Sequence, residues 1–381
     1  MLAATLFLTT RNARAAEEAL PSPTATLSPS ATAAPAAAIL PVETLAPAVA
    51  AAGMPKPLLF DLHGGALLWQ YLPFVKGYKP SASIYAAYLT FDKHTNDFGF
   101  HFEPRFRDTK LRPFFKSNVW IQEAYVSWDG LGKYGVLKAG KEYTHFGYFW
   151  DGSFYGNLPY FDGITLDPDV GLSLEGEPEI TGGIGLEYAA QFMPNDGGTN
   201  GALAGRDALS EGARQRNEVV ARIAPFYRIG RDGKAQIGAS YQSFTVEEPA
   251  GTPNEKVRRF EVDANVTYAG ARAFGEYVSQ DGRHVLNYPA TGLGSKKNDY
   301  VWIGIGYTWH ALDFRYNATQ ANYSDVKYQE TVHNPGLVVT LNPDFSVMLE
   351  YVYWSARSTA PGSKKEAILD RSGNLVLIGR F

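Results

Sequence analysis

The 381-residue chain contains no cysteine, and from Leu58 to Phe381 it lacks any run of 18 apolar residues. That part of the chain therefore cannot cross a membrane as a helix, whereas membrane-spanning strands need no such run. The absence of cysteine suits an oxidising compartment. The chain also lacks a cationic excess, because its formal net charge is −4, and this excludes a strongly basic nucleic-acid-binding surface.

The chain is instead rich in aromatic residues, which make up 14% of it, and in glycine, with 38 residues. The stretch from Tyr300 to Thr319 predicts two alternating strands joined only by His310 and Ala311. In its second strand, Leu312, Phe314, Tyr316 and Ala318 alternate with Asp313, Arg315, Asn317 and Thr319. One face of such a strand suits lipid and the other suits water.

The connections between strand-like runs from Leu58 onward alternate strictly between short and long. The seven short ones are 92–97, 129–133, 177–181, 230–233, 269–271, 310–311 and 342–344. The eight long ones are 71–80, 108–117, 144–169, 194–215, 247–256, 281–297, 325–330 and 357–369. This segregation predicts an all-β fold, a 16-stranded antiparallel transmembrane β-barrel with short periplasmic turns and long external loops. A soluble sandwich has no reason to segregate its loop lengths.

Three predicted strands, 119–128, 271–280 and 345–354, carry apolar residues on both faces, so their orientation stays open. A contact between subunits or a loop packed inside the barrel would each explain this pattern.

The residues before the barrel form two segments. Residues 1–15 have a short apolar stretch and end in Ala13-Arg14-Ala15, which predicts a signal-peptide remnant whose basic beginning is missing. Residues 16–57 are dominated by Ala, Pro, Ser and Thr, which predicts a disordered periplasmic linker with possible cell-wall contact. The barrel domain is expected at 58–381.

Two motifs resemble bacterial outer-membrane proteins. The terminal Phe381 follows a strand-like run, as in their last strands. Gln122-Glu-Ala-Tyr-Val-Ser-Trp128 and Gly135-Val-Leu-Lys-Ala-Gly-Lys141, then a long loop and Val170-Gly-Leu-Ser-Leu-Glu175, resemble the 16-stranded porins of Gram-negative bacteria. The resemblance implies a homotrimer in the outer membrane, secreted by a signal peptide, with the third external loop folded into the lumen. It also implies passive diffusion of small hydrophilic solutes or ions, with no cofactor.

The inward loop is the segment 144–169, which carries four aspartates and no Lys or Arg. We expect a pore constriction between these aspartates and cations on the predicted lumen faces. The aspartates are Asp151, Asp162, Asp167 and Asp169, and the cations are Arg105, Arg107, Lys141, Arg222, Arg228 and Arg315. The alternative places the aspartates on the outer rim. Lys141 is ambiguous, because its neighbour Glu142 must point to the opposite face.

The loop aromatics from Phe146 to Phe161 suit either a carbohydrate track or attachment of the loop to the wall, so a carbohydrate- or phosphate-selective channel stays open. Catalysis is not expected, because none of the seven histidines accompanies a serine motif. No metal site is expected either, since Asp167 and Asp169 lack further ligands at loop spacing. A structural anchor barrel without transport is the alternative outside transport.

Overall fold

The fold is taken from a computed structural model. It describes residues 60–75, 79–108, 118–148, 153–154, 158, 164, 168–195, 214–247, 254–282, 296–359 and 366–381. The predicted signal-peptide remnant and linker lie outside these residues. Among the described residues, no helix has both the length and the apolarity needed to span a bilayer.

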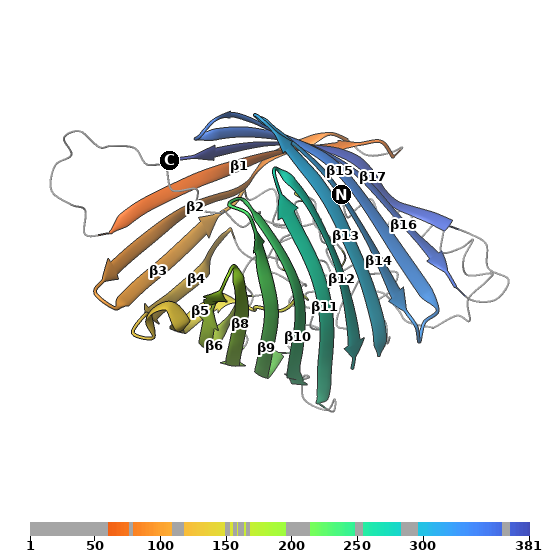
Figure 1. The fold of residues 1–381 in the computed structure, drawn as a ribbon. Coiled ribbons are helices and arrows are strands. Elements are labelled where there is room, and N and C mark those ends of the chain that lie inside the picture. The colour runs from red at the N-terminus through yellow and green to blue at the C-terminus, as the bar shows by residue number, and fades with distance from the viewer. Residues whose placement is uncertain are drawn as a thin grey trace.

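The described chain is one antiparallel β-sheet closed into a barrel (Figure 1). Its strands are β1 (Asp61–Pro73), β2 (Ser81–Thr95), β3 (Phe98–Phe106), β4 (Val119–Trp128), β5 (Val136–Tyr143), β6 (Pro168–Gly176), β7 (Glu179–Thr181), β8 (Ile184–Asn195), β9 (Arg214–Ile229), β10 (Gly233–Glu247), β11 (Glu255–Tyr268), β12 (Ala271–Asp281), β13 (Lys297–Trp309), β14 (Leu312–Tyr323), β15 (Tyr328–Asn342), β16 (Phe345–Ser358) and β17 (Glu366–Arg380). A short 3-10 helix, η2 (Gly132–Tyr134), precedes β5.

The barrel has sixteen strand positions around its circumference, as the sequence predicts, although the described residues form seventeen strands. Both β6 and the three-residue β7 pair with β8, so β6 and β7 together occupy one strand position. The predicted turn at 177–181 is corrected here, because the chain reverses at Gly182 and Gly183, with φ of +58° and +82°. Pro178 interrupts the strand instead, since proline has no N–H to donate to the ladder.

The seam of the barrel joins β1 to β17. Gly65 pairs with Arg380 and Pro73 with Ser372 in a continuous antiparallel register. Just beyond it, the backbone N–H of Gly64 donates to Phe381 O at 3.0 Å, and Phe381 N–H donates back to Gly64 O at 2.9 Å. Closure leaves no unpaired sheet edge at the seam, which is the condition for a sheet that lies in lipid.

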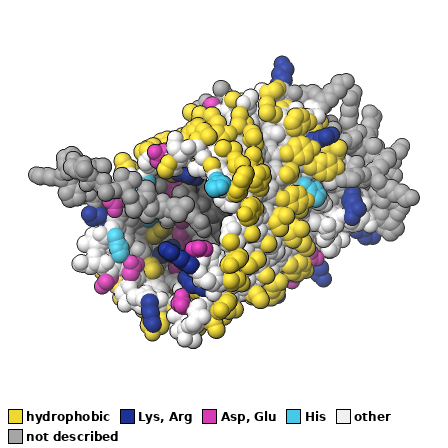
Figure 2. Space-filling model, turned by 45° about the horizontal axis from the view of Figure 1, so that its top comes forward, with side chains coloured by type: hydrophobic (Ala, Val, Ile, Leu, Met, Phe, Trp, Pro, Cys, Tyr) yellow, Lys and Arg dark blue, Asp and Glu magenta, His cyan; other side chains and the backbone are white. Residues whose placement is uncertain are grey.

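The outer surface of the wall is apolar. In β13, alternate side chains are exposed, from Val301 at 42% through Ile305 at 62% to Trp309 at 56%. Tyr300 and Trp302, which point to the opposite face, are buried. The strand at 260–268 shows the same alternation as predicted, with Phe260 and Val262 exposed and Glu261 and Asp263 buried. Figure 2 shows hydrophobic side chains gathered over the outside of the wall and charged ones around a recess.

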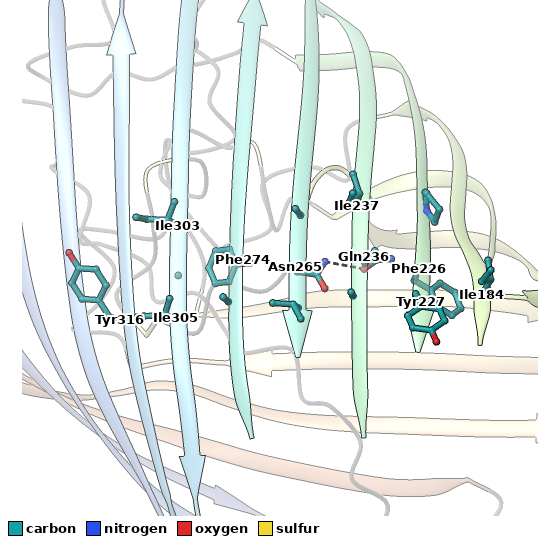
Figure 3. A pocket seen from close by; sticks show the side chains of 16 residues that line it. Ile184, Phe226, Tyr227, Gln236, Ile237, Asn265, Phe274, Ile303, Ile305 and Tyr316 are labelled. Atoms are coloured by element: carbon teal, nitrogen blue, oxygen red, sulfur yellow. Dashed lines mark hydrogen bonds between the residues drawn. The ribbon is translucent and has the colours of Figure 1, made fainter. Parts of the chain in front are cut away.

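One hollow lies in this apolar outer wall, at strands β8–β14 (Figure 3). It has a volume of about 790 Å³. Ile237, Ile303 and Ile305 border it, and the small side chains of Ala264 and Ala273 leave the room for it. The lining is apolar, so the hollow suits hydrocarbon rather than a hydrophilic solute.

The sequence left the orientation of three strands open, and these strands are β4, β12 and β16. Each of them places apolar side chains on both sides of the wall. In β12, Phe274 and Val278 are buried while Tyr277 is exposed, and in β16, Val352 and Trp354 are buried while Leu349 is exposed. In β4, Val119, Ile121 and Val126 are exposed and Trp120 is buried. The buried members lie inside the barrel, so the packed interior loop accounts for their apolar character.

The interior holds an apolar core on one side of the lumen. Four residues of the loop after β5, namely Phe146, Phe154, Leu158 and Ile164, belong to it. The wall contributes Trp69, Tyr71, Tyr85, Trp120, Tyr300, Tyr323, Met348, Val352, Trp354 and Val376, among others. The core therefore joins the loop to β1, β2 and the last strands, and it leaves the polar side chains on the remaining wall.

Candidate functional site: the interior loop and the charged wall

The loop leaves the wall at Tyr143, the last residue of β5. Gln191 of β8 holds this root, because its side-chain oxygen accepts from His145 N–H at 2.6 Å and its amide donates to Tyr143 O at 3.1 Å. Two residues later, Gly147 N–H donates to Ser240 Oγ of β10 at 3.1 Å. The loop has thus reached strands on another part of the ring.

The next contacts carry the loop across the lumen. Tyr148 stacks near Phe274 of β12, with ring centroids 4.9 Å apart. Further on, Ser153 Oγ–H and Phe154 N–H both donate to the carboxylate of Glu350 in β16, at 2.7 and 2.9 Å. The Phe154 ring lies 5.7 Å from that of Trp69 in β1. The described residues of this third loop therefore lie inside the barrel, as predicted.

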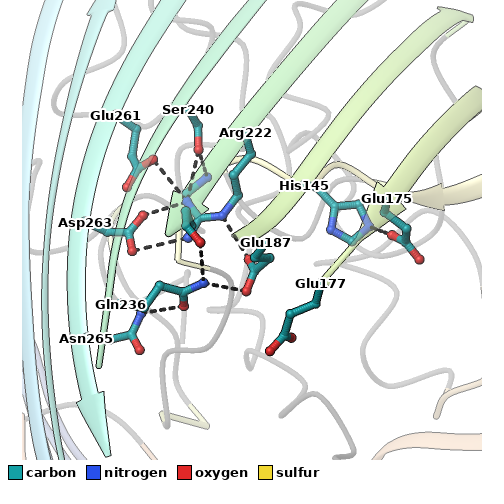
Figure 4. A network of polar contacts seen from close by, with 12 residues as sticks. His145, Glu175, Glu177, Glu187, Arg222, Gln236, Ser240, Glu261, Asp263 and Asn265 are labelled. Atoms are coloured by element: carbon teal, nitrogen blue, oxygen red, sulfur yellow. Dashed lines mark hydrogen bonds and ion pairs between the residues drawn. The ribbon is translucent and has the colours of Figure 1, made fainter. Parts of the chain in front are cut away.

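A network of charges surrounds Arg222 of β9 (Figure 4). Its guanidinium donates to both carboxylate oxygens of Asp263, at 2.6 and 3.2 Å. It also forms ion pairs with Glu261 at 3.4 Å and with Glu187 at 3.3 Å. Ser240, which holds Gly147, accepts from the same guanidinium at 3.1 Å. The charged network and the loop therefore share a contact.

Two more predicted cations lie together near the end of β3. Arg105 forms an ion pair with Glu103, and both are buried. The Arg107 guanidinium lies 3.8 Å from the centre of the Trp120 ring, a cation–π contact. Neither arginine faces the passage without a partner, because Arg105 pairs with Glu103 and Arg107 packs on the Trp120 ring.

The other predicted cations are placed elsewhere. Arg315 pairs with Asp313 at 2.6 Å close to the short turn after β13, and Arg272 joins the same carboxylate at 2.5 Å. Arg228 is half exposed beside Glu179, also at the short-turn end. Lys141 pairs in register with Val170, which is exposed on the outer face, and its ammonium donates to Ile121 O. The prediction of Lys141 on the lumen wall is corrected accordingly, since it lies on the face opposite Glu142.

Of the predicted aspartates, the described residues include only Asp169. It is buried in β6, and Gln215 of β9 donates to it at 3.0 Å. Asp151, Asp162 and Asp167 lie outside the described residues. The structure therefore tests neither the negative side of the predicted constriction nor the alternative at the rim.

Sequence reasoning missed the acidic character of the wall. Among the described buried residues, ten carboxylate side chains stand against four arginines. The carboxylates are Glu103, Glu142, Asp169, Glu218, Glu261, Asp263, Glu276, Glu330, Glu350 and Asp370. The signal was present at Glu261 and Asp263, which alternate with apolar residues on the polar face of one strand. Two of these arginines, Arg105 and Arg222, pair with carboxylates, and carboxylates outnumber arginines among the described buried residues.

The fold of the barrel is similar to that of solved membrane channels. No protein-family model matches the chain, and no curated protein matches it by sequence. The outer membrane channel DcaP of Acinetobacter baumannii is 14% identical, with a TM-score of 0.57 over 84% of this chain and 97% of that one. The anion-selective porin from Comamonas acidovorans is 11% identical, with a TM-score of 0.57 over 84% and 99% of the two chains.

OmpF of Salmonella typhi, solved in complex with daunomycin, is 12% identical, with a TM-score of 0.57 over 84% of this chain and 97% of that one. At these identities the likeness is one of fold. The chain has the fold of outer-membrane porins, a closed 16-strand antiparallel β-barrel.

Proposed function

We propose that the protein is an outer-membrane porin through which small hydrophilic solutes or ions diffuse passively, and that loop 144–169 narrows its lumen. The observation that carries this proposal is the path of the loop. It leaves β5, contacts Ser240 of β10 and Phe274 of β12, and reaches Glu350 of β16 at Ser153. A loop that crosses the interior limits the size of what can pass.

The charge of the wall supports a preference for cations. Ten buried carboxylates stand against four buried arginines among the described residues. In a narrow passage with low-dielectric walls, one sign of charge raises the local concentration of the opposite ion. Asp151, Asp162 and Asp167 of the loop add to this negative charge if they line the passage.

A homotrimer is the assembly that we propose. Its support is a polar patch on the outer face of β14–β16, where the Tyr316 hydroxyl lies 2.8 Å from His333 Nδ1. A small hollow of about 190 Å³ beside it is lined by Gln320, Thr331 and His333, among others. Polar side chains at this face are better covered by a second copy than by hydrocarbon. We further propose that residues 1–15 direct secretion and that 16–57 form a periplasmic linker.

Recordings from the purified barrel in planar lipid bilayers test the function. We expect discrete current steps. In a KCl gradient, we expect the reversal potential to have the sign of a channel that passes potassium more readily than chloride. Heat-denatured protein is the matched control and should give no steps. A folded barrel that passes no current would overturn the proposal and favour a structural anchor. A reversal potential of the opposite sign would overturn the cation preference alone.

A further inference from the structure

Three side chains with metal-binding donor atoms meet where the interior loop leaves the wall. Glu142 is the last but one residue of β5, His145 is the second residue of the loop, and Glu175 lies near the end of β6. One donor atom from each lies within 4.8 Å of the other two. Neither the channel function nor the attachment of the loop requires this arrangement.

Glu142 is the most deeply buried member, with only 1% of its surface exposed. The Ser173 hydroxyl lies near its carboxylate, but within the described part of the chain neither carboxylate oxygen has a partner at normal hydrogen-bond geometry. Its ion pair with the Lys138 ammonium is long, at 3.7 Å. A buried carboxylate without hydrogen bonds is costly unless a cation compensates it, so the position favours an additional cation.

His145 supplies a nitrogen donor beside these oxygens. Its Nε2 lies 2.8 Å from Glu175 Oε2, a contact visible in Figure 4. Gln191 fixes the backbone at His145, so the imidazole is held at the root of the loop rather than on its free part. One imidazole and two carboxylates are a ligand set that suits divalent first-row transition metals such as Zn²⁺.

The local balance of charge points the same way. Asp169 pairs in register with Glu142 and is also 1% exposed, which places a further buried carboxylate beside the site. Lys138 is the cation present, and it contacts Glu175. Like charges that face each other across strands are destabilising, as Glu142 and Asp169 do here, so an ion of charge +2 bound at Glu142 would relieve the repulsion.

We propose that Glu142, His145 and Glu175 bind a divalent transition-metal ion at the root of the interior loop. Three protein ligands leave the remaining coordination positions to water. Binding requires Nε2 of His145 without a proton, so uptake of the metal releases any proton held there. The bound ion would tie the loop to β5 and β6. The binding itself does not depend on whether the barrel conducts.

Calorimetric titration of the full-length barrel, in chelator-treated detergent buffer, with ZnCl₂ tests the site. We expect one Zn²⁺ per chain and affinity about 10–100-fold lower in Glu142→Gln and in His145→Gln. His94→Gln is the matched control, because His94 is exposed and pairs with Asp129 at the short-turn end, and its affinity should equal that of the wild type. Equal affinity in all four proteins would overturn the proposal, as would the absence of binding.

Two further measurements do not depend on how well the variants fold. Co²⁺ added to the wild type should give a visible absorption spectrum with the intensity of a site of low coordination number. An unchanged aqueous Co²⁺ spectrum would overturn the proposal. Mg²⁺ should fail to displace Zn²⁺ at equal concentration, because magnesium prefers oxygen ligands in an octahedral site. Displacement by Mg²⁺ would show general screening of carboxylates and also overturn it.

Lys138→Met gives a prediction in the opposite direction. It removes the resident ammonium that contacts Glu175, so Zn²⁺ affinity should rise by about tenfold, because a competing charge is lost. A fall in Zn²⁺ affinity would contradict a metal site formed by Glu142, His145 and Glu175.

Discussion

The backbone N–H of Phe154 donates to the carboxylate of Glu350 at 2.9 Å, although 196 residues separate the two in sequence. This contact ties the interior loop, whose root is on β5, to β16 on another part of the ring. Ser153 adds a second hydrogen bond to the same carboxylate. One side chain of β16 therefore accepts two hydrogen bonds from the loop, in addition to the apolar core that attaches the loop to the wall.

Glu350→Ala should loosen this part of the loop. Hydrogen bonds to a charged group contribute roughly 1.5–3 kcal/mol each, and the substitution removes two of them. We expect larger and more variable single-channel conductance, and faster entry of larger sugars in liposome-swelling assays. Glu179→Ala, at the half-exposed short-turn end, is the control. Wild-type conductance and sugar cut-off in the Glu350 variant would show that the loop is held by its apolar core alone.

Arg222→Gln should strengthen the preference for cations. Asp263, Glu261 and Glu187 would lose the guanidinium that all three contact, and breaking a buried pair costs about 3–5 kcal/mol of folding free energy. We expect a larger reversal potential in a KCl gradient and a lower urea midpoint. Arg228→Gln is the control, since Arg228 is half exposed. A shift toward anions would contradict the acidic wall.

Asp162→Asn combined with Asp167→Asn should reduce the preference for cations if these loop residues line the passage. The change removes two negative charges while it preserves side-chain size. The reversal potential in a KCl gradient is the measurement. If it equals that of the wild type, the two aspartates belong to the rim and not to the constriction.

Gly147→Ala should disturb the loop near its root. Gly147 has φ of +73°, where an L-residue costs about 1–2 kcal/mol, and its new Cβ would also meet the carboxylate of Glu276. Gly182→Ala separates the two effects, because Gly182 has φ of +58° and open space around it. We expect altered conductance only in the Gly147 variant. Similar conductance in both variants would show that contact with Glu276 does not position the loop.

Ile303→Arg tests which face of the wall meets lipid. Ile303 is exposed in the middle of β13, and an arginine at the bilayer midplane costs about 2–4 kcal/mol. Trp309→Arg, near the short turn, should cost about 0–1 kcal/mol, because the penalty falls toward the interface. Urea unfolding in lipid vesicles measures both. Equal penalties would mean that the exposed band is not centred in the bilayer.

The sequence predicted the ring better than the interior. The alternation at Phe260–Tyr268 and the order of short and long connections were enough to predict sixteen strand positions. They suffice because the period of two along a strand is a local property of the sequence. The turn at 177–181 failed, since Pro178 marks a break in the strand whereas Gly182 and Gly183 form the reversal. Local pattern cannot tell these two uses of turn-forming residues apart.

The charges of the site were harder to predict, because partners are set by register between strands. Arg222 was expected on the lumen face, but its pairing with Asp263 depends on which residues of β9, β10 and β11 stand side by side. Lys141 was misplaced for a related reason, as the face of β5 could not be assigned from a strand of eight residues. A positive wall was expected because the arginines were counted without their acidic neighbours.

The pairing of β1 with β17 has a consequence for biogenesis. Trp69 Nε1–H donates to Asn374 Oδ1 at 2.9 Å across 305 residues, and no strand between them can substitute for that pairing. Until β17 pairs with β1, both edges of the sheet carry unpaired backbone N–H and C=O groups. The incomplete sheet is therefore prone to aggregate. Folding is therefore expected to be slow and to benefit from a chaperone that shields those edges until the ring closes.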